Sequence, residues 1–320
     1  MLRALHLGDL LVTVPALRAL RRALPDHRIV LATAGSLAPL VTLSGAVDEL
    51  LPTPDVDALT WPGPPPDVAV NLHGRGPQSH RALDELQPRA CIGFRAPGWD
   101  GPDFDEIGAQ HRHERERWCA LLEAHGIPAD PGDLRLPAPA GVVPGRSGAP
   151  VLVHPGARYG AKRWPVRRFA EVAAALDGPL SPVLTTGTAD ERPLAAAVAS
   201  GAGLAGSRVL AGRTDLAELC ALVAGAALVV SGDTGIAHLA AAFGTPSVTL
   251  FGPVDPDQWG PPANGPHRTL GDPGVRRGDP FADDPDPALL AVGVGDVLRA
   301  AARLRDHRPQ TPDTPATTTA

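Results

Sequence analysis

The sequence has only three cysteines, no excess of positive charge and no long apolar run, and each absence excludes a class of protein. Cys91, Cys119 and Cys220 are too scattered for a structural metal site or a disulfide framework, a pattern typical of the reducing cytoplasm. The formal net charge of −6 offers no basic surface to nucleic acid. No run reaches the roughly 18 apolar residues expected of a membrane-spanning helix.

Signal sequences and two nucleotide-binding signatures are also missing. The first residues read as a strand rather than as a signal peptide. The chain has no GxxxxGK[ST] loop and no GxGxxG after a strand, which disfavours a kinase and a dehydrogenase. The acidic run "DDPDP" (283–287) lies in a proline-rich loop rather than at a strand end, which disfavours a metal-dependent sugar transferase. We therefore expect a cytoplasmic monomer with no metal, no cofactor, no nucleic-acid partner and at most a peripheral membrane contact.

What the sequence does contain is a repeated alternation of short apolar runs with amphipathic stretches, typical of βα units and parallel sheets. With 320 residues, 43% of them hydrophobic, the chain is long enough for two domains that each have a core. Strands are predicted over 3–7, 27–33, 66–74, 89–94, 150–156, 181–187, 226–232 and 247–252, and helices over 10–24, 36–44, 112–127 (with a charged outer face), 164–176, 236–243 and 295–304.

A stretch rich in proline, glycine and alanine from 128 to 150 interrupts this pattern and is predicted to be a linker. We therefore predict two doubly wound α/β domains, 1–148 and 149–305, facing each other across a cleft, and a disordered tail over 306–320. In such sheets ligands bind at the carboxyl ends of the strands. Only two residues precede Arg3 in the first strand, so we expect a frayed central strand or further residues upstream.

The stretch "VVSGDTGIAHLAAAFGTP" (229–246) places a polar segment between a core strand and a short apolar helix. The start of that helix leaves backbone N–H groups unpaired, and together with the helix dipole they favour a phosphate. Gly235 lets a ligand approach the backbone closely. The alternative is that Asp233 or Thr234 serves only as an N-cap. Since a bare carboxylate repels a diphosphate, Asp233 as a ligand contact would accept hydrogen bonds from sugar hydroxyls.

Two further strand ends carry candidate donor contacts, with cations or hydroxyls at the edge where phosphates are expected to bind. Loop charges exposed to solvent are the alternative explanation for the cations. The candidates are Arg158, Lys162 and Arg163 in "HPGARYGAKRWP" (154–165), and Thr186 and Thr188 in "TTGTADE" (185–191).

In the first half, "HLGDLLVTVPALRAL" (6–20) places Asp9 between a strand and an apolar helix. Asp9 is either an N-cap or a general base at the rim of the cleft. The segment "NLHGRGPQSHRAL" (71–83) ends a strand in His73, Gly74 and Arg75, which is a candidate acceptor-binding edge. His73 could equally be an ordinary exposed loop residue.

Taken together and in this order, the motifs resemble the heptosyltransferase family (glycosyltransferase family nine). The resemblance covers residues 3 to 261. The matching segments are "RALHLGDLLVTVPALRALRRALPDHRI", "PDVAVNLHGR", "CIGFR", "VLVHPGARYGAKRWPVRRFAEVAAAL" and "VVSGDTGIAHLAAAFGTPSVTLFGPVDPDQWGP". The resemblance implies a GT-B fold of two Rossmann-like domains. It also implies transfer with inversion of a sugar, typically heptose from ADP-heptose, to a glycan hydroxyl, as in lipopolysaccharide biosynthesis.

The resemblance also implies a role for individual positions. Asp9 matches the proposed base of the family, and Lys162 matches the lysine that contacts the phosphates. Ala189 stands near where some members carry an acidic donor contact, and Asp190 or Glu191 are the candidates to replace it. The implied donor-binding residues are Asp233, Thr234, Gly235, His238, Thr186, Thr188, Arg163, and Gly252 and Pro253 of the loop "GPVDP" (252–256); the acceptor-binding residues are His73, Arg75 and Gly8.

We predict an inverting, metal-independent glycosyltransferase whose N-terminal domain binds a glycan, lipid-linked or metabolite acceptor. The C-terminal domain would bind a nucleotide-diphospho-sugar, ADP-heptose by resemblance. Asp9 would take the proton of the acceptor, while Lys162 and the amides of 234–236 would stabilise the departing diphosphate. Two alternatives stay open: a nucleotide-sugar epimerase on the same fold, and a non-catalytic nucleotide-sugar or glycan-binding module.

Overall fold

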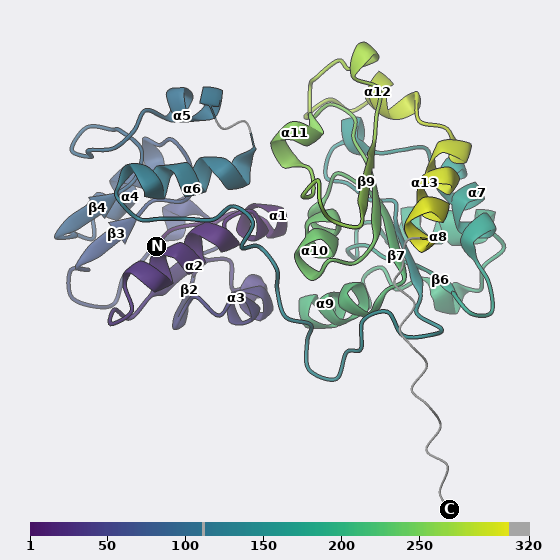
Figure 1. Ribbon diagram of the computed structural model, residues 1–320, viewed down its shortest axis with the longest axis horizontal. Helices are drawn as coiled ribbons and strands as arrows, with labels where there is room; N and C mark the ends of the chain where they lie inside the picture. The colour runs from purple at the N-terminus through teal and green to yellow at the C-terminus, as the bar shows by residue number, and fades with distance from the viewer. Residues whose placement is uncertain (111–112, 307–320) are drawn as a thin grey trace, which may run out of the picture.

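The computed structural model describes residues 1–110 and 113–306, so the predicted tail lies, from residue 307 on, outside the described residues. Two α/β halves lie side by side, each with parallel strands at its centre (Figure 1). Residues 128–150, the predicted linker, contain neither helix nor strand. The predicted α/β class with parallel sheets is thereby confirmed, while the domain limits at 148 and 149 stay a prediction.

The C-terminal half is built on a five-stranded parallel sheet whose strand order is β6-β5-β7-β8-β9. Its short apolar runs become strands because they are buried on both faces, which is usual in parallel sheets. The strands are β5 (Val151–His154), β6 (Val183–Thr185), β7 (Leu228–Gly232), β8 (Ser247–Leu250) and β9 (His267–Leu270).

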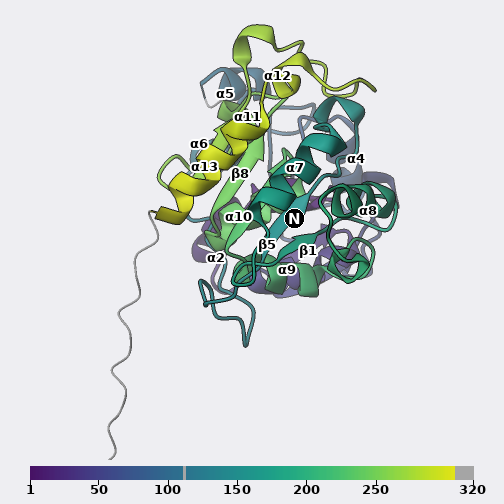
Figure 2. The ribbon, with the colours of Figure 1, turned by 90° about the vertical axis from the view of Figure 1, so that its right-hand side faces the viewer.

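Helices cover both faces of this sheet because successive side chains of each strand point to opposite sides. Val151 and Val153 of β5 pack with α7, α8 and α13, whereas Leu152 packs with α9 and α10. Figure 2 shows α7, α8 and α13 in front of the sheet. The helices are α7 (Val166–Leu176), α8 (Arg192–Gly201), α9 (Leu216–Gly225), α10 (Gly235–Phe243), α12 (Pro287–Leu290) and α13 (Val294–Asp306), with α11 (Pro256–Trp259) after β8.

The N-terminal half holds two parallel strand pairs, β1 (Val30–Thr33) with β2 (Glu49–Pro52) and β3 (Val68–Val70) with β4 (Ala90–Ile92). The first three residues lie between the pairs: Leu2 N donates to Val70 O at 2.9 Å, and Arg3 N donates to Ala32 O at 2.9 Å. They join both pairs into one layer. The helices around it are α1 (Leu7–Leu11), α2 (Val14–Ala23), α3 (Ala38–Ser44), α4 (Gln78–Asp84), α5 (Phe104–Gln110) and α6 (Glu114–Ala124).

Two predictions for the start of the chain are wrong. The strand expected over 3–7 ends at Arg3, because α1 already begins at Leu7 and Asp9 Oδ2 accepts the His6 N–H at 3.2 Å. The helix expected over 10–24 is two helices, α1 and α2. Pro15, in the first turn of α2, has no N–H and so starts a helix more readily than it continues one.

The structure also differs from the predictions at the edge strands, at two helices and in the exposure of charged side chains. The edge strands β2 and β9 were not predicted, and neither were helices α8 and α9. The predicted charged outer face of α6 is wrong for its first turn: Glu114 and Arg117 pair with each other and are only 14% and 17% exposed. The neighbouring α5 covers them, with Arg117 Cζ 4.8 Å from the centre of the Phe104 ring.

The two halves share one apolar cluster. Leu10 and Leu11 of α1 belong to the same set of buried side chains as Ile236 and Leu239 of α10. The contact between α1 and α10 therefore fixes the carboxyl-end loops of one half against those of the other.

Candidate active site

The strand order of the C-terminal sheet creates a natural binding position. The chain leaves β5 toward β6 on one side and returns to β7 on the other, so the loops after β5 and β7 diverge. In doubly wound sheets ligands bind in the crevice that this reversal opens. The loop after β5 carries Lys162, and the loop after β7 carries Asp233 and Thr234.

These two loops are joined by an ion pair. Lys162 Nζ donates to Asp233 Oδ2 at 2.6 Å, and the Asp233 side chain is 6% exposed. The N-cap of α10 is Thr234, and its side chain makes no capping hydrogen bond. The alternative that Asp233 only caps the helix is therefore wrong, since its carboxylate is bound to the lysine. The pair leaves Lys162 with two further N–H donors.

The helices α1 and α10 touch through glycines. A Cβ atom added to Gly8 would lie 2.8 Å from His238 Cδ2, and one added to Gly235 would lie 2.5 Å from Leu7 Cδ2. Only residues without a side chain allow so close an approach. The contact brings Asp9, the neighbour of Gly8, to the beginning of α10.

His238 marks the point where the predicted residues of both halves meet. Burial lowers the pKa of His238, and the charges of Asp233 and Asp9 oppose that shift, while Lys162 adds to it. Its imidazole also lies edge-on to the Trp259 ring, 5.9 Å between ring centres. The charges of Asp9, Asp233 and Lys162 thus all act on one imidazole.

Asp9 is the third residue of α1 rather than its N-cap. One carboxylate oxygen accepts the His6 N–H, and the other lies 3.6 Å from Arg3 Nη2. The side chain keeps 24% of its surface exposed. Asp9 is therefore both a helix-start residue and an accessible carboxylate.

On the acceptor side, His73 is half-buried at the end of β3, and its Nδ1 atom is buried without a hydrogen-bond partner. Burial lowers the pKa of His73, the charge of Arg3 lowers it further, and Asp9 opposes both. Arg3 Nη2 lies 3.6 Å from the Asp9 carboxylate and Nη1 donates to the carbonyl of the residue before His73, so the same guanidinium links His73 to Asp9. Arg75 instead lies exposed on the surface, 3.7 Å from Asp105.

The side chains of three other predicted donor-binding residues already make hydrogen bonds within the protein. Thr186 is buried with its Oγ1 3.3 Å from His154 Nδ1, whereas Thr188 is exposed and donates through N and Oγ1 to Glu191. Arg163 donates to the backbone oxygens of Ala157 and Arg158 and so closes the loop after β5.

The loop 252–256, which carries two of the implied donor-binding residues, is held by contacts with Arg276. Gly252 and Pro253 are buried, and the Gly252 carbonyl accepts from Arg276 Nε at 3.1 Å. Arg276 also pairs with Asp255 at 3.1 Å. Sequence reasoning missed Arg276, because nothing near it in the sequence indicates a partner more than twenty residues earlier.

Two more cross-chain contacts were missed. Arg158 Nη1 lies 2.6 Å from His6 Nε2, which joins the loop after β5 to the residue before α1. His113, the N-cap of α6, lies with Nε2 2.8 Å from the carbonyl of Gly260, just after α11. Both bind the N-terminal half to the loops that carry the predicted donor site.

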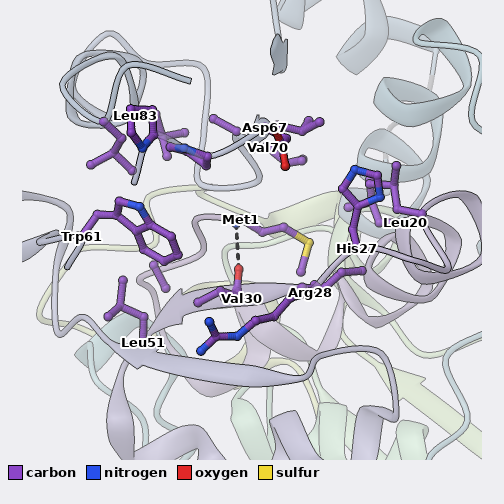
Figure 3. A pocket seen from close by; sticks show the side chains of 18 of the residues that line it. Met1, Leu20, His27, Arg28, Val30, Leu51, Trp61, Asp67, Val70 and Leu83 are labelled. Carbon is purple, nitrogen blue, oxygen red and sulfur yellow. Dashed lines mark hydrogen bonds between the residues drawn. The ribbon is translucent and has the colours of Figure 1, made fainter. Parts of the chain in front are cut away.

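A cavity of about 460 Å³ lies elsewhere, in the N-terminal half (Figure 3). Its lining includes Val30 and Val68, the first residues of β1 and β3, and the Trp61 ring. It is therefore at the amino ends of the strands, opposite the edge where doubly wound sheets bind ligands. None of the predicted site residues lines it.

Within residues 1–110 and 113–306, no group of three His, Cys, Asp or Glu side chains is placed to hold a metal ion. In the same part of the chain, no helix has both the length and the apolar character needed to cross a bilayer.

Known proteins are similar to this chain in sequence over part of its length and in fold over nearly all of it. Residues 139–269 match the model for glycosyltransferase family 9 (heptosyltransferase). A segment of 107 residues is 37% identical to lipopolysaccharide heptosyltransferase 2 of Salmonella typhimurium, covering 32% of this chain and 31% of that protein. The matched segment thus spans about a third of the length of such curated relatives.

Two solved structures extend the likeness over nearly the whole chain. The family 9 glycosyl transferase of Veillonella parvula has a TM-score of 0.75 and 19% identity over 96% of both chains. The E. coli heptosyltransferase WaaC with ADP has a TM-score of 0.69 and 18% identity, over 95% of this chain and 98% of that one. The predicted GT-B fold of two Rossmann-like halves is confirmed.

Proposed function

We propose that the chain, whose residues 139–269 match the model for glycosyltransferase family 9 (heptosyltransferase), is a glycosyltransferase of that family with an inverting, metal-independent mechanism. Its donor would be a nucleotide-diphospho-sugar, and its acceptor a hydroxyl of a glycan, a lipid-linked glycan or a metabolite. The observation that carries the proposal is the α1–α10 contact, which places Asp9 beside the group around His238.

Among nucleotide-diphospho-sugars, the comparisons favour an ADP-heptose-like donor. The heptosyltransferase WaaC of similar fold was solved with ADP and with ADP-2-deoxy-2-fluoro heptose. Here Lys162 would contact the diphosphate with the N–H donors that Asp233 leaves open. Asp233 would orient the lysine, whose positive charge would offset that of the phosphates. Thr234, Gly235, Gly252 and Pro253 would complete the donor site.

The reaction needs one displacement. The acceptor oxygen would form a bond to the anomeric carbon while the bond from that carbon to the diphosphate breaks, and the acceptor proton would move to Asp9. The leaving diphosphate would take the electron pair of the broken bond, stabilised by Lys162 and the amides at the start of α10. His73 would position the acceptor hydroxyl through its half-buried imidazole, with Gly8 in the neighbouring α1.

Donor turnover with and without acceptor tests the class of function. A transferase releases nucleoside diphosphate rapidly only with an acceptor, an epimerase converts the donor without one, and a binding module does neither. Thermal shift with a panel of nucleotide-sugars identifies the donor, since a ligand at a hundred times its Kd adds about 2.7 kcal/mol to stability.

Metal removal tests the proposed role of Lys162 in place of a metal. We expect full activity after dialysis against EDTA, because the lysine and the helix start supply the positive potential. Loss of activity that returns on adding a divalent cation would overturn the metal-independent mechanism.

A further inference from the structure

A buried arginine lies directly behind Asp9. The Arg3 side chain is 2% exposed, and burial lowers its pKa to about 10, with the charges of Asp9 and Glu114 opposing the shift. The guanidinium is therefore still charged at neutral pH. Burying a charge costs free energy unless the charge is paired and hydrogen-bonded. The hydrogen-bond partners of Arg3 therefore show which segments it holds in place.

The guanidinium of Arg3 binds both elements of the proposed acceptor side. Nε donates to the backbone oxygen of Asp9 at 3.0 Å, and Nη1 donates to that of Leu72 at 2.6 Å. The first bond fixes α1 and the second fixes the residue before His73. Nη2 also lies 3.6 Å from the Asp9 carboxylate.

The plane of this guanidinium is fixed as well. Cζ of Arg3 lies 4.7 Å from the centre of the Trp118 ring on α6, so the group is stacked on a buried indole. On the other side Glu114 is an electrostatic partner, itself paired with Arg117. A planar group with donors in two directions ties two segments together in a way that a lysine ammonium cannot.

We propose that Arg3 is the positioning residue of the acceptor side, which holds the Asp9 carboxylate and the His73 imidazole at a fixed separation. This inference rests on the proposed function, since it assigns Asp9 and His73 to one acceptor hydroxyl. Arg3 itself does not touch the reacting atoms: it acts through Asp9. The alternative is that Arg3 only stabilises the end of the first strand.

The test compares Arg3→Lys with Arg18→Lys. Arg18 is a matched control, because its guanidinium also binds backbone oxygens, those of Ser44, Asp133 and Arg135, but on α2 and away from the site. We expect Arg3→Lys to lower kcat about ten- to hundredfold with an unchanged donor Kd, since a misplacement of about 1 Å can cost 10²-fold. Arg18→Lys should change the melting temperature alone.

A double-mutant cycle separates positioning from a general loss of stability. In an Asp9→Asn background, Arg3→Lys should lower turnover less than about twofold, because the group through which it acts is already gone. An equal fold-loss in both backgrounds, or a loss no larger than that of Arg18→Lys, would overturn the proposal.

An NMR titration of His73 tests the geometry without any substrate. Since Arg3 lowers the pKa of His73 and Asp9 raises it, Arg3→Met should raise that pKa and Asp9→Asn should lower it. Asp9→Asn is expected to fold even if Arg3→Met does not. An unmoved His73 pKa in the folded variants would overturn the proposal, whereas the expected shifts with an inactive wild-type protein would instead refute the transferase function.

Discussion

Asp9 is a helix-start residue and the proposed general base, and a single substitution separates the two. The side-chain oxygen of asparagine can still accept the His6 N–H, but an amide cannot accept the acceptor's proton. We expect Asp9→Asn to stay folded with a lower melting temperature, because buried Arg3 loses its ionic partner, and to keep its donor affinity, while turnover falls about 10²–10⁴-fold. Nucleotide release measures the turnover, and isothermal titration measures the donor affinity.

The other outcomes of the Asp9→Asn experiment are also informative. Near-normal turnover would reduce Asp9 to a helix-start residue and make His73, whose pKa is lowered by burial, the next candidate base. Loss of donor binding would instead mean that the donor and acceptor sides are assigned to the wrong halves.

Lys162 is the residue on which the proposed metal-free transfer would depend. We expect Lys162→Ala to lose about 2–4 kcal/mol of transition-state stabilisation, because one preorganised charge is removed from the leaving group. Steady-state kcat/KM measures this loss. Arg167→Ala is the control, since Arg167 is 90% exposed on α7 and pairs only with Glu171. If the two variants have equal kinetics, Lys162 is a structural partner of Asp233 and nothing more.

Among the elements, the contact of α1 with α10 depends on Gly8. A Cβ there would overlap the ring of His238, so Gly8→Ala should destabilise the protein by about 1–3 kcal/mol and lower turnover as α1 shifts. Urea unfolding measures the first effect. Gly206→Ala is the control, because a Cβ at that position meets nothing within 4 Å. Equal stabilities of the two variants would show that His238 moves aside freely.

The sequence was informative where an element is buried on both faces. β7 and α10 were predicted nearly to the residue because a continuous apolar run is followed by glycines and a second apolar run, with Gly244 ending the helix in the left-handed region. The edge strands β2 and β9 were missed because most of their side chains are partly or fully exposed and leave no periodic pattern.

For the site, the sequence indicated which residues come together but not what they bind. Lys162 and Asp233 form an ion pair, and Gly8, beside Asp9, lies against His238, whereas Arg163 is bonded to backbone oxygens that no local pattern reveals. Arg3 was read only as part of a strand. Its partner Trp118 lies on α6, and a stacking contact over such a sequence separation gives no local signal.

At the scale of the whole molecule, the two halves are joined by a histidine that must remain neutral. His113 accepts the Arg115 N–H through Nδ1 and binds Gly260 through Nε2. Burial, and then the charges of Arg115 and His238, lower its pKa to about 4, although the bond to Gly260 opposes them. In the unfolded chain a histidine has a pKa near 6.5.

Folding should therefore weaken as the pH falls through this range. Between about pH 6.5 and 4 the unfolded state binds a proton that the folded state does not, so stability rises with pH there. From pH 7.5 to 5 we expect His113 to contribute a loss of about 2 kcal/mol in unfolding free energy. His113→Gln should reduce the pH dependence by that amount, and His27→Gln, at an exposed site, should not. Identical pH profiles for both variants would contradict this.

The α1–α10 contact has a consequence for the order in which the chain folds during its synthesis. The apolar side chains that α1 shares with α10 lie far apart in the sequence, so the ribosome makes Leu10 and Leu11 long before Ile236 and Leu239. Until then the N-terminal half has an uncovered apolar face, the kind of surface that makes nascent multidomain chains prone to aggregate. The same helix pair that joins the proposed donor and acceptor sides can therefore form only after the chain has been synthesised through α10.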